Sequence, residues 1–293
     1  MLGKNKARII PIILLAVSLV IIPSLKGLGI EVAEAQKIAV AVGGDFNCKS
    51  QEGAATIRTI DQTNLPFIPL GDYGYDKVQC WIDLVENIAE DGNLVRCVIG
   101  NHELVVKGDM QKIIKFCKNN SNGSFAISIG RVFFIGINLY VPWKAGTEQY
   151  KYINTTLANA QKSGKYDIIV ANTHELMKTF KTNGGHPATK GYLQTYEPLF
   201  KKYGVKVVNQ AHTHVQAVRQ GSITYTICGT GGEMRDKLIP GEGSTWLGKT
   251  ATEKGFCVEE FDGKHSNLIM VNQKGIERDC DFPKDKQCRF KMS

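Results

Sequence analysis

Aspartate, asparagine, tyrosine and histidine side chains recur in this sequence directly after short apolar segments. Five loops share the arrangement, at residues 43–47, 71–75, 100–103, 172–175 and 211–214. Their side chains offer carboxylate, phenolate, amide and imidazole donors without a thiolate, a set that selects iron, manganese, zinc or magnesium over copper(I) or iron–sulfur clusters. Because ligands of open α/β sheets bind at the carboxyl ends of strands, we expect these loops to meet at one place.

Histidine usage supports a shared site. The chain has six histidines, and only His265 lies outside the candidate segments. A single Asp-Gly turn or histidine is usually structural, but the coincidence at five strand ends indicates a metal cluster. Two ions about 3.5–4 Å apart can clamp the attacking and leaving oxygens of a phosphoryl displacement. One carboxylate must then lie between the two cations, because they repel each other.

Apolar β-rich segments alternate with helical patterns early in the chain, which predicts an α/β fold. Strands are expected at residues 37–42, 66–70, 94–99, 125–129, 131–137, 167–171, 205–208, 223–228, 255–261 and 267–271, and helices at 52–63, 80–90, 109–119, 147–162 and 191–203. The two segments joined through Gly130 predict a hairpin. The last third is mostly strand, so we expect more antiparallel pairing than in a doubly wound sheet. No linker rich in Pro, Gly or Ser interrupts residues 36–293, which we treat as one domain.

Three motifs carry a family resemblance. They are Gly71-Asp72, Gly100-Asn101-His102-Glu103, and the His-x-His pair of His212 and His214. They resemble the signature of the calcineurin-like metallophosphoesterases. The spacing from Asp72 to Tyr75 is similar to that of the purple acid phosphatases, in which a tyrosine binds the ferric ion. The resemblance covers roughly residues 38–272 and implies a two-sheet β-sandwich flanked by helices, the calcineurin-like phosphoesterase fold.

The resemblance also implies roles for individual residues. The first metal ion would be held by Asp45, Asp72, Tyr75 and His214, and the second by Asp72, Asn101, His174 and His212, with Asp72 bridging the two. His102 and His186 would be the catalytic histidines that contact phosphate and assist the leaving group. The implied cofactors are two metal ions, Fe(III) plus a divalent ion of iron, zinc or manganese.

Three features depart from the family pattern. Asn47 stands where most metallophosphoesterases have a metal-binding histidine, so Tyr75 would replace the missing ligand and Asn47 would be a bystander or a weak oxygen ligand. Ala211 replaces the usual glycine before the His-x-His pair, a small change expected to tighten the turn. The large N-terminal accessory domain of plant purple acid phosphatases is absent, so the sequence resembles the short, single-domain type.

The function expected from these residues is that of an acid phosphatase-like hydrolase. A metal-bound hydroxide would attack the phosphorus of a phosphate monoester in line, without a covalent phosphoenzyme. Two alternatives stay open: a phosphodiesterase or nuclease on the same core, and a non-catalytic surface protein that binds phosphate or metal. The loops contain no recognisable motif that identifies the substrate.

The first 35 residues predict export. Lys4, Lys6 and Arg8 precede an apolar run at residues 9–22, and Ala33-Glu34-Ala35 matches a cleavage site, which is the layout of a secretory signal peptide. The alternative is a retained N-terminal anchor over residues 9–30, which would attach the chain to a membrane. Either reading makes the protein secreted or places it on the extracellular face of the membrane.

Charge and cysteine content narrow the expected partners and compartment. The formal charge of +8 favours anionic substrates such as phosphate esters. Because the basic residues are scattered along the chain, they predict no specific nucleic-acid binding. Eight cysteines in an exported chain allow disulfides. Cys280 and Cys288 are candidates for a bridge in the polar tail. Cys97 and Cys228 lie in apolar runs and are expected to be plain core residues.

Overall fold

The structure is a computed structural model. It describes residues 37–178, 182–183, 186–233, 237–238, 245–246, 254–263, 265–275 and 289–292. The expected export segment lies outside the described residues, and so do Cys280 and Cys288.

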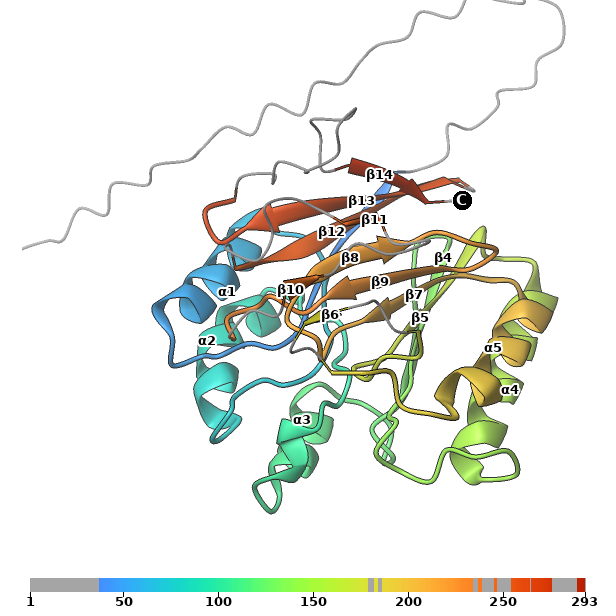
Figure 1. Cartoon of the computed structure of the whole chain (residues 1–293), viewed down its shortest axis with the longest axis horizontal. Coiled ribbons are helices and arrows are strands. Elements are labelled where there is room, and N and C mark those ends of the chain that lie inside the picture. The colour runs from blue at the N-terminus through green and yellow to red at the C-terminus, as the bar shows by residue number, and fades with distance from the viewer. Residues whose placement is uncertain are drawn as a thin grey trace, which may run out of the picture. The chain divides into compact units, whose positions relative to one another are not determined.

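Two β-sheets form the centre of the described structure (Figure 1). The first has the order β14-β13-β12-β1-β2, with β1 and β2 parallel and the other neighbours antiparallel. Its strands are β1 (Ile38–Gly43), β2 (Phe67–Pro69), β12 (Gly255–Asp262), β13 (His265–Asn272) and β14 (Arg289–Met292).

The second sheet has the order β11-β8-β9-β7-β5-β4-β3. Its central strands β4, β5, β7 and β9 are parallel, and its outer pairs are antiparallel. The strands are β3 (Phe125–Ile129), β4 (Val132–Gly136), β5 (Ile168–Asn172), β7 (Val205–Gln210), β8 (Gln216–Arg219), β9 (Thr224–Cys228) and β11 (Thr245–Trp246). A separate short pair joins β6 (Thr182–Asn183) to β10 (Lys237–Leu238).

Helices cover the outer face of each sheet (Figure 1). The first sheet packs against α1 (Gln51–Thr63), α2 (Gln79–Glu90) and α3 (Asp109–Phe116), and the second against α4 (Glu148–Ser163) and α5 (Tyr192–Tyr203). Strand β4 shows how alternation builds these layers. Phe133 and Ile135 lie in the apolar cluster with α4 and α5, whereas Phe134 lies in the cluster between the sheets, where its ring meets Phe261.

Local sequence signals set the ends of these helices. Ser50 caps α1 by accepting a hydrogen bond from the Gly53 amide, and Thr147 caps α4 in the same way. Asn64 and Gly164 end the two helices in the left-handed conformation that each tolerates. The helices therefore begin and end where the sequence provides polar caps, and their apolar faces turn towards the sheets.

The sequence predicted most of this arrangement. The described residues contain all five expected helices and nine of the expected strands, including the antiparallel hairpin through Gly130. The two-sheet fold class is confirmed. The prediction of a strand at residues 94–99 was wrong, because only a single bridge joins Leu94 to Phe67. The segment nevertheless runs beside β2, where the Val98 amide donates to the Pro69 carbonyl. Strands β6, β8, β10, β11 and β14 were not expected.

Three disulfides join distant parts of the described chain. They are Cys48–Cys80, Cys97–Cys117 and Cys228–Cys257. The expectation that Cys97 and Cys228 are plain core residues was therefore wrong: an apolar setting shows that a cysteine is buried but cannot reveal its partner. Cys228–Cys257 links β9 to β12 and so ties the two sheets together.

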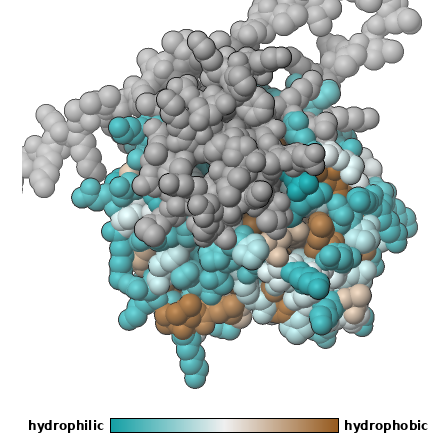
Figure 2. Space-filling view, viewed as in Figure 1, coloured by the Kyte–Doolittle hydropathy of each residue, from teal (hydrophilic) through white to brown (hydrophobic). Residues whose placement is uncertain are grey.

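The described surface is largely hydrophilic in the view of Figure 2, with a hydrophobic patch along its lower edge. Leu104 and Val105 are the exposed large hydrophobic residues of the described chain, and both directly follow the Gly100–Glu103 motif. Among the described residues, we find no helix that is long and apolar enough to cross a membrane.

A buried polar network lies between the two sheets. The Asn209 side chain of β7 donates to Asn172 of β5 and to Glu259 of β12, and it accepts from Thr226 of β9. All four residues are fully buried. The second carboxyl oxygen of Glu259 has no hydrogen-bond partner among the described residues. Burial raises the pKa of Glu259 from 4.5 to about 7.

Glu259 should therefore make stability depend on pH. Above pH 4.5 the unfolded chain releases this proton, whereas the folded protein keeps it until about pH 7. The contribution of Glu259 to the free energy of unfolding thus falls by about 3 kcal/mol as pH rises through this window, at about 1.36 kcal/mol per pKa unit. We expect Glu259→Gln to remove that decline in urea unfolding at pH 5, 6, 7 and 8. Glu260→Gln, at the neighbouring ion-paired position, is the control; equal pH slopes in the wild type and Glu259→Gln would contradict the assignment.

Candidate metal centre

The expected ligands converge where strands of both sheets end. Asp45 follows β1 and Asp72 follows β2 of the first sheet, while His174 follows β5 and His212 follows β7 of the second. The parallel register aligns Asn172 with Asn209, so the chains emerge from β5 and β7 side by side. The site is therefore built from the carboxyl ends of strands from both sheets, as the sequence predicted.

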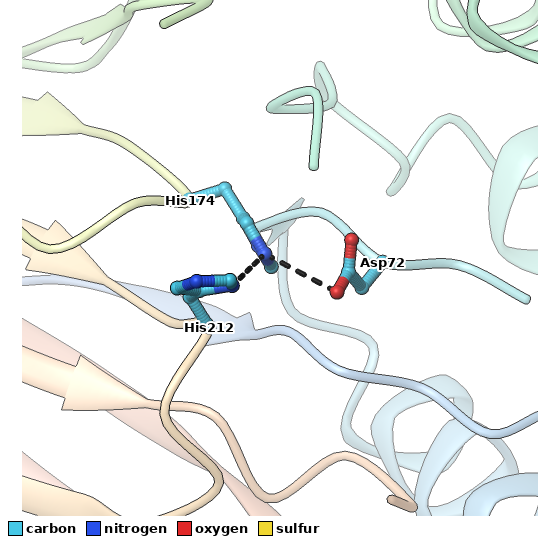
Figure 3. A group of neighbouring side chains, drawn as sticks. All are labelled: Asp72, His174 and His212. Carbon is cyan, nitrogen blue, oxygen red and sulfur yellow. Dashed lines mark hydrogen bonds and ion pairs between the residues drawn. The ribbon is translucent and has the colours of Figure 1, made fainter. Parts of the chain in front are cut away.

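Three donor atoms surround the ring nitrogen Nε2 of His174. Asn101 Oδ1 and His212 Nδ1 each lie 3.1 Å from it, and Asp72 Oδ2 lies at 3.3 Å. Figure 3 shows His174 between Asp72 and His212, each reaching the group from a different loop. A metal ion with ligands at about 2.1 Å holds neighbouring donor atoms about 3.0–3.4 Å apart. The spacing of this group therefore fits a metal ion at its centre.

The hydrogen bonds of His174 reinforce this fit. Its Nδ1 lies 2.8 Å from the Leu70 carbonyl oxygen, which can only accept, so Nδ1 carries the proton. In the neutral ring, Nε2 then presents a lone pair to the amide oxygen of Asn101 and the carboxylate of Asp72. Electron pairs facing one another need a proton or a metal ion between them. A backbone carbonyl on the other ring nitrogen is also the usual way in which a metal-binding histidine is oriented.

Electrostatics at this group favour positive charge. Burial opposes the charged form of His174, but the Asp72 carboxylate outweighs it and raises the pKa of His174 to about 10. Burial likewise opposes ionisation of Asp72, yet His174 and His102 lower its pKa to about 2. Burial and the neighbouring His174 charge lower the pKa of His212 to about 2, which leaves its Nδ1 free to act as a donor atom. In the absence of a metal ion, a proton on His174 supplies the charge that the group demands.

The donor group expected to hold the first metal ion contains Asp45, Tyr75 and His214. The Tyr75 hydroxyl lies 3.2 Å from His214 Nε2 and 3.5 Å from Asp45 Oδ1, and those two atoms are 3.5 Å apart. The edges of this triangle are close to those expected around one metal ion. Burial and the Asp45 carboxylate raise the pKa of Tyr75, so the phenolate forms only if a cation offsets the nearby negative charge.

Backbone strain coincides with three of the expected ligands. Asp45, Asp72 and His212 have φ values of 62°, 58° and 66°, in the left-handed region. Non-glycine residues in this region are uncommon, and they cluster at functional sites because the surrounding structure must hold them there. Each turn redirects a side chain from the end of a strand into the site. The amide of His212 also donates to Asp45, and the amide of His102 donates to Asp72, each at 2.9 Å.

Two glycines permit this crowding. A Cβ atom at Gly100 would lie 2.2 Å from Asp72 Oδ1, and one at Gly71 would lie 2.6 Å from His174 Nδ1. Gly71 also has a φ of +99°, which other residues rarely adopt. Any side chain at either position would push a ligand out of place.

Glu103 organises the Asp72 loop, a role that the sequence did not reveal. It is fully buried, and its carboxylate accepts hydrogen bonds from the amides of Gly100, Asp72 and Tyr73 at 2.7, 3.1 and 2.9 Å. Burial and the Asp72 charge raise the pKa of Glu103 to about 7, while these amides favour the ionised form. Its position in the Gly-Asn-His-Glu motif was the available signal, but its contacts could not be read from it.

Two further histidines lie beside the donor groups. The His102 ring is partly exposed, packs 4.2 Å from the Tyr75 ring and has Nε2 3.9 Å from Asp72 Oδ2. The exposed His186 stacks on His212 with ring centres 4.2 Å apart, and Thr213 donates to its carbonyl oxygen. Both expected catalytic histidines therefore lie next to the groups without joining them.

Glu175 and Asn47 lie near the donor groups and form contacts of their own. The Glu175 carboxylate lies 3.8 Å from His212 Nε2. It accepts hydrogen bonds from the hydroxyl groups of Tyr140 and Thr189, which hold it beside that histidine. Asn47 donates to Glu233 at 2.8 Å and accepts from Lys49, contacts that suit the bystander role.

Ala211 is compatible with the turn before the His-x-His pair. It is fully buried, and its amide donates to the His174 carbonyl. The positive φ falls on His212 instead, so a residue with a Cβ is tolerated at position 211.

Comparison with known proteins identifies the fold. No family model matches the sequence, and no curated protein matches it. Among solved structures, the chain is similar to purple acid phosphatase PPD1 from yellow lupin (Lupinus luteus) seeds, with a TM-score of 0.69 and 17% identity over 89% of this chain and 54% of that one. The chain thus spans about half the length of the lupin protein.

Two other solved structures are also similar to this chain. GAP50, described as the anchor in the inner membrane complex of Plasmodium, gives a TM-score of 0.65 and 14% identity over 88% of this chain and 89% of that one. A dimetal phosphatase from Danio rerio gives 0.59 and 9% identity over 87% and 98%. The chain therefore has the fold of the calcineurin-like metallophosphoesterases, as its motifs predicted.

Replacement of Glu103 tests its organising role. Glu103→Gln loses acceptor capacity and turns an amide group towards backbone N–H donors, so we expect the free energy of unfolding to fall by about 2–4 kcal/mol. Urea unfolding of the metal-free protein measures this directly. Glu90→Gln, at an exposed position on α2, is the matched control and should change stability little. Equal stability of the two variants would show that the Glu103 contacts are dispensable.

Proposed function

We propose that this chain hydrolyses phosphate monoesters with the help of two metal ions. The observation that carries the proposal is the pair of adjoining donor groups, one around His174 and one around Tyr75, each with the spacing of a single metal site. Asp72 is the residue proposed to bridge them. It is buried, its loop is held by Glu103, and its charge acts on both His174 and Tyr75.

The chain's own residues would divide the work of the reaction. When bound, the metal ions would polarise the phosphoryl oxygens and lower the pKa of water in the site. Asp45, Asp72 and Glu103 fix the donor geometry through their bonds to backbone amides. We assign to His102 and His186 the contact with phosphate, in which either would hydrogen-bond or protonate the leaving oxygen.

Tyr75 bears on which metals are bound. A phenolate is a hard, anionic ligand suited to Fe(III), and tyrosine serves as an iron ligand elsewhere. The negative surroundings that raise the pKa of Tyr75 would also attract a trivalent cation. We therefore propose Fe(III) beside Tyr75 and a divalent ion of iron, zinc or manganese beside His174.

Export rests on two observations. The N-terminal 35 residues have the pattern of a secretory signal or an anchor. Three disulfides in the described chain suit an oxidising compartment, because such bonds are rare in the cytosol of most organisms. We propose that the protein is secreted or held at the extracellular face of a membrane.

A non-catalytic binder is the second candidate. It is favoured by the similarity to GAP50, whose description is that of an anchor. A nitrophenyl monoester and the matching diester, assayed with the metal-loaded full chain, separate the candidates. We expect monoester turnover to exceed diester turnover. The reverse order would favour the phosphodiesterase, and metal-loaded protein that binds phosphate without turning over either ester would be the binder.

Two variants assayed beside the wild type test the assigned roles. Asp72→Asn should lose most bound metal and nearly all hydrolysis, because the bridging charge is gone. His102→Ala should keep both metals while its turnover falls by about 10²–10⁴, the usual range for acid–base help. Metal analysis of the purified variants separates these effects. Near-normal turnover in Asp72→Asn would exclude the bridge, and metal loss in His102→Ala would make that residue a ligand.

The Tyr75→Phe variant tests the metal beside the first group. An iron(III)–phenolate pair absorbs visible light by charge transfer, so the iron-loaded, oxidised protein should be coloured. Tyr75→Phe should bleach it, whereas Tyr73→Phe, two positions earlier on the same loop, should keep the absorption band. A colourless iron-loaded protein, or an unchanged spectrum in Tyr75→Phe, would point to manganese or zinc instead.

A further inference from the structure

The Cys48–Cys80 disulfide links the loop that carries Asp45 to the first turn of α2, just beyond the loop that carries Tyr75. Cys48 lies three residues after Asp45, and Cys80 lies five residues after Tyr75. The Cα atoms of the two cysteines are 6.0 Å apart. The bridge therefore spans the loops just beyond the residues whose donor atoms must stay within 3.5 Å of each other.

Near the strands, backbone hydrogen bonds already hold these loops together. The Asp45 amide donates to the Gly71 carbonyl at 3.0 Å, and the Phe46 amide donates to the Asp72 carbonyl at 2.8 Å. Beyond Asp72, the contacts between the loops are of a different kind. Lys49 forms an ion pair with Asp76, but both side chains are about two-thirds exposed, at 65% and 64%, and such pairs contribute little.

Packing places the disulfide directly against the Tyr75 segment. A Cβ atom at Gly74 would lie only 3.3 Å from Cys48 Sγ, so the sulfur rests on the residue that precedes Tyr75. Tyr75 is thus held between the backbone bonds at Asp72 on one side and the bridge at Cys80 on the other. Without the bridge, the segment from Gly74 to Cys80 would be tied to the Asp45 loop by the contact between Tyr75 and Asp45 and by the exposed ion pair.

Among the described disulfides, this is the one that solvent can reach. Cys80 is partly exposed, and a cavity of about 200 Å³ is lined by Asn47, Cys48, Lys49, Tyr75, Asp76 and Cys80. The other described bridges are buried: Cys97, Cys228 and Cys257 are 0% exposed and Cys117 is 3% exposed. A small thiol should therefore reduce Cys48–Cys80 first, because exchange requires access to a sulfur atom.

We propose that Cys48–Cys80 is a solvent-accessible positioning element that keeps Tyr75 at metal-binding distance from Asp45 and His214. The inference rests on the proposed two-metal function and concerns the first position only. In the reaction, one thiolate of an external dithiol attacks Cys80 Sγ and releases the Cys48 thiolate, which takes up a proton. The second thiol of the reductant then displaces Cys80, so two electrons and two protons reach the cysteines and the reductant leaves as its cyclic disulfide.

Reduction should weaken one metal position and spare the other. The second group, around His174, is held by Leu70, Glu103 and the strand ends, none of which depends on this bridge. Residues that orient metal ligands usually affect affinity by roughly 10- to 100-fold. We expect the metal at the first position to bind more weakly by that factor after reduction, and the second metal to bind unchanged.

The experiment uses the metal-loaded full chain before and after mild treatment with dithiothreitol. Alkylation and mass spectrometry should find Cys48 and Cys80 labelled while the four buried cysteines are protected. Titration with a competing chelator, followed by metal analysis, then measures the affinity of each equivalent. The iron–phenolate band should fade as the first equivalent leaves, and reoxidation with added metal should restore it.

Two variants sharpen the result. Cys48→Ser/Cys80→Ser should reproduce the reduced state without any reductant. Lys49→Ala/Asp76→Ala breaks the ion pair between the same two loops and should leave both affinities unchanged. Equal affinities in oxidised and reduced protein would overturn the proposal, and so would loss of both metals together or labelling of the buried cysteines first. Oxidised protein that never binds two equivalents would overturn the two-metal function itself, which distinguishes that failure from failure of the bridge alone.

Discussion

Burial of negative charge at the ends of the strands is the constraint on which the site depends. Asp45 and Glu103 are 0% exposed and Asp72 is 1% exposed. A buried carboxylate is costly unless it is paired and hydrogen-bonded. Backbone amides meet part of that need at each of the three residues. The remaining need is for positive charge, and it explains why His174, in spite of its burial, has a raised pKa.

The two sheets make it possible to hold this charge in one geometry. Ligands at strand ends inherit the rigidity of the strands, whereas ligands on long loops do not. The Asn209–Glu259 contact and the Cys228–Cys257 bridge both cross between the sheets behind the site. They resist sliding of one sheet over the other, a motion that would separate Asp72 from His174. Stability of the interior and geometry of the site are therefore supported by the same contacts.

Sequence patterns predicted well, for a physical reason, which side chains gather where the strands end. When an apolar strand is followed directly by Asp or His, that side chain lies at the carboxyl end of the strand, independently of the rest of the sequence. The 94–99 segment shows the limit, since its apolar run is extended but is held by hydrogen bonds too few to make a regular strand. Contact partners could not be predicted from the sequence either. The pairing of Cys97 with Cys117 and the three amides bound by Glu103 arise only when the loops fold together.

The fold alone does not separate an enzyme from a scaffold, because an anchor and two phosphatases have similar structures. The local costs are more discriminating. Left-handed backbone at Asp45, Asp72 and His212 costs on the order of 1–3 kcal/mol at each residue. A protein that used this architecture only as a scaffold would gain nothing from that strain, whereas a metal-binding protein gains the alignment of its ligands.

Binding alone, however, does not account for His102 and His186, which flank the donor groups from the accessible side. Side chains at these positions are the ones that we propose to contact phosphate. That combination favours hydrolysis over binding as the purpose of the site.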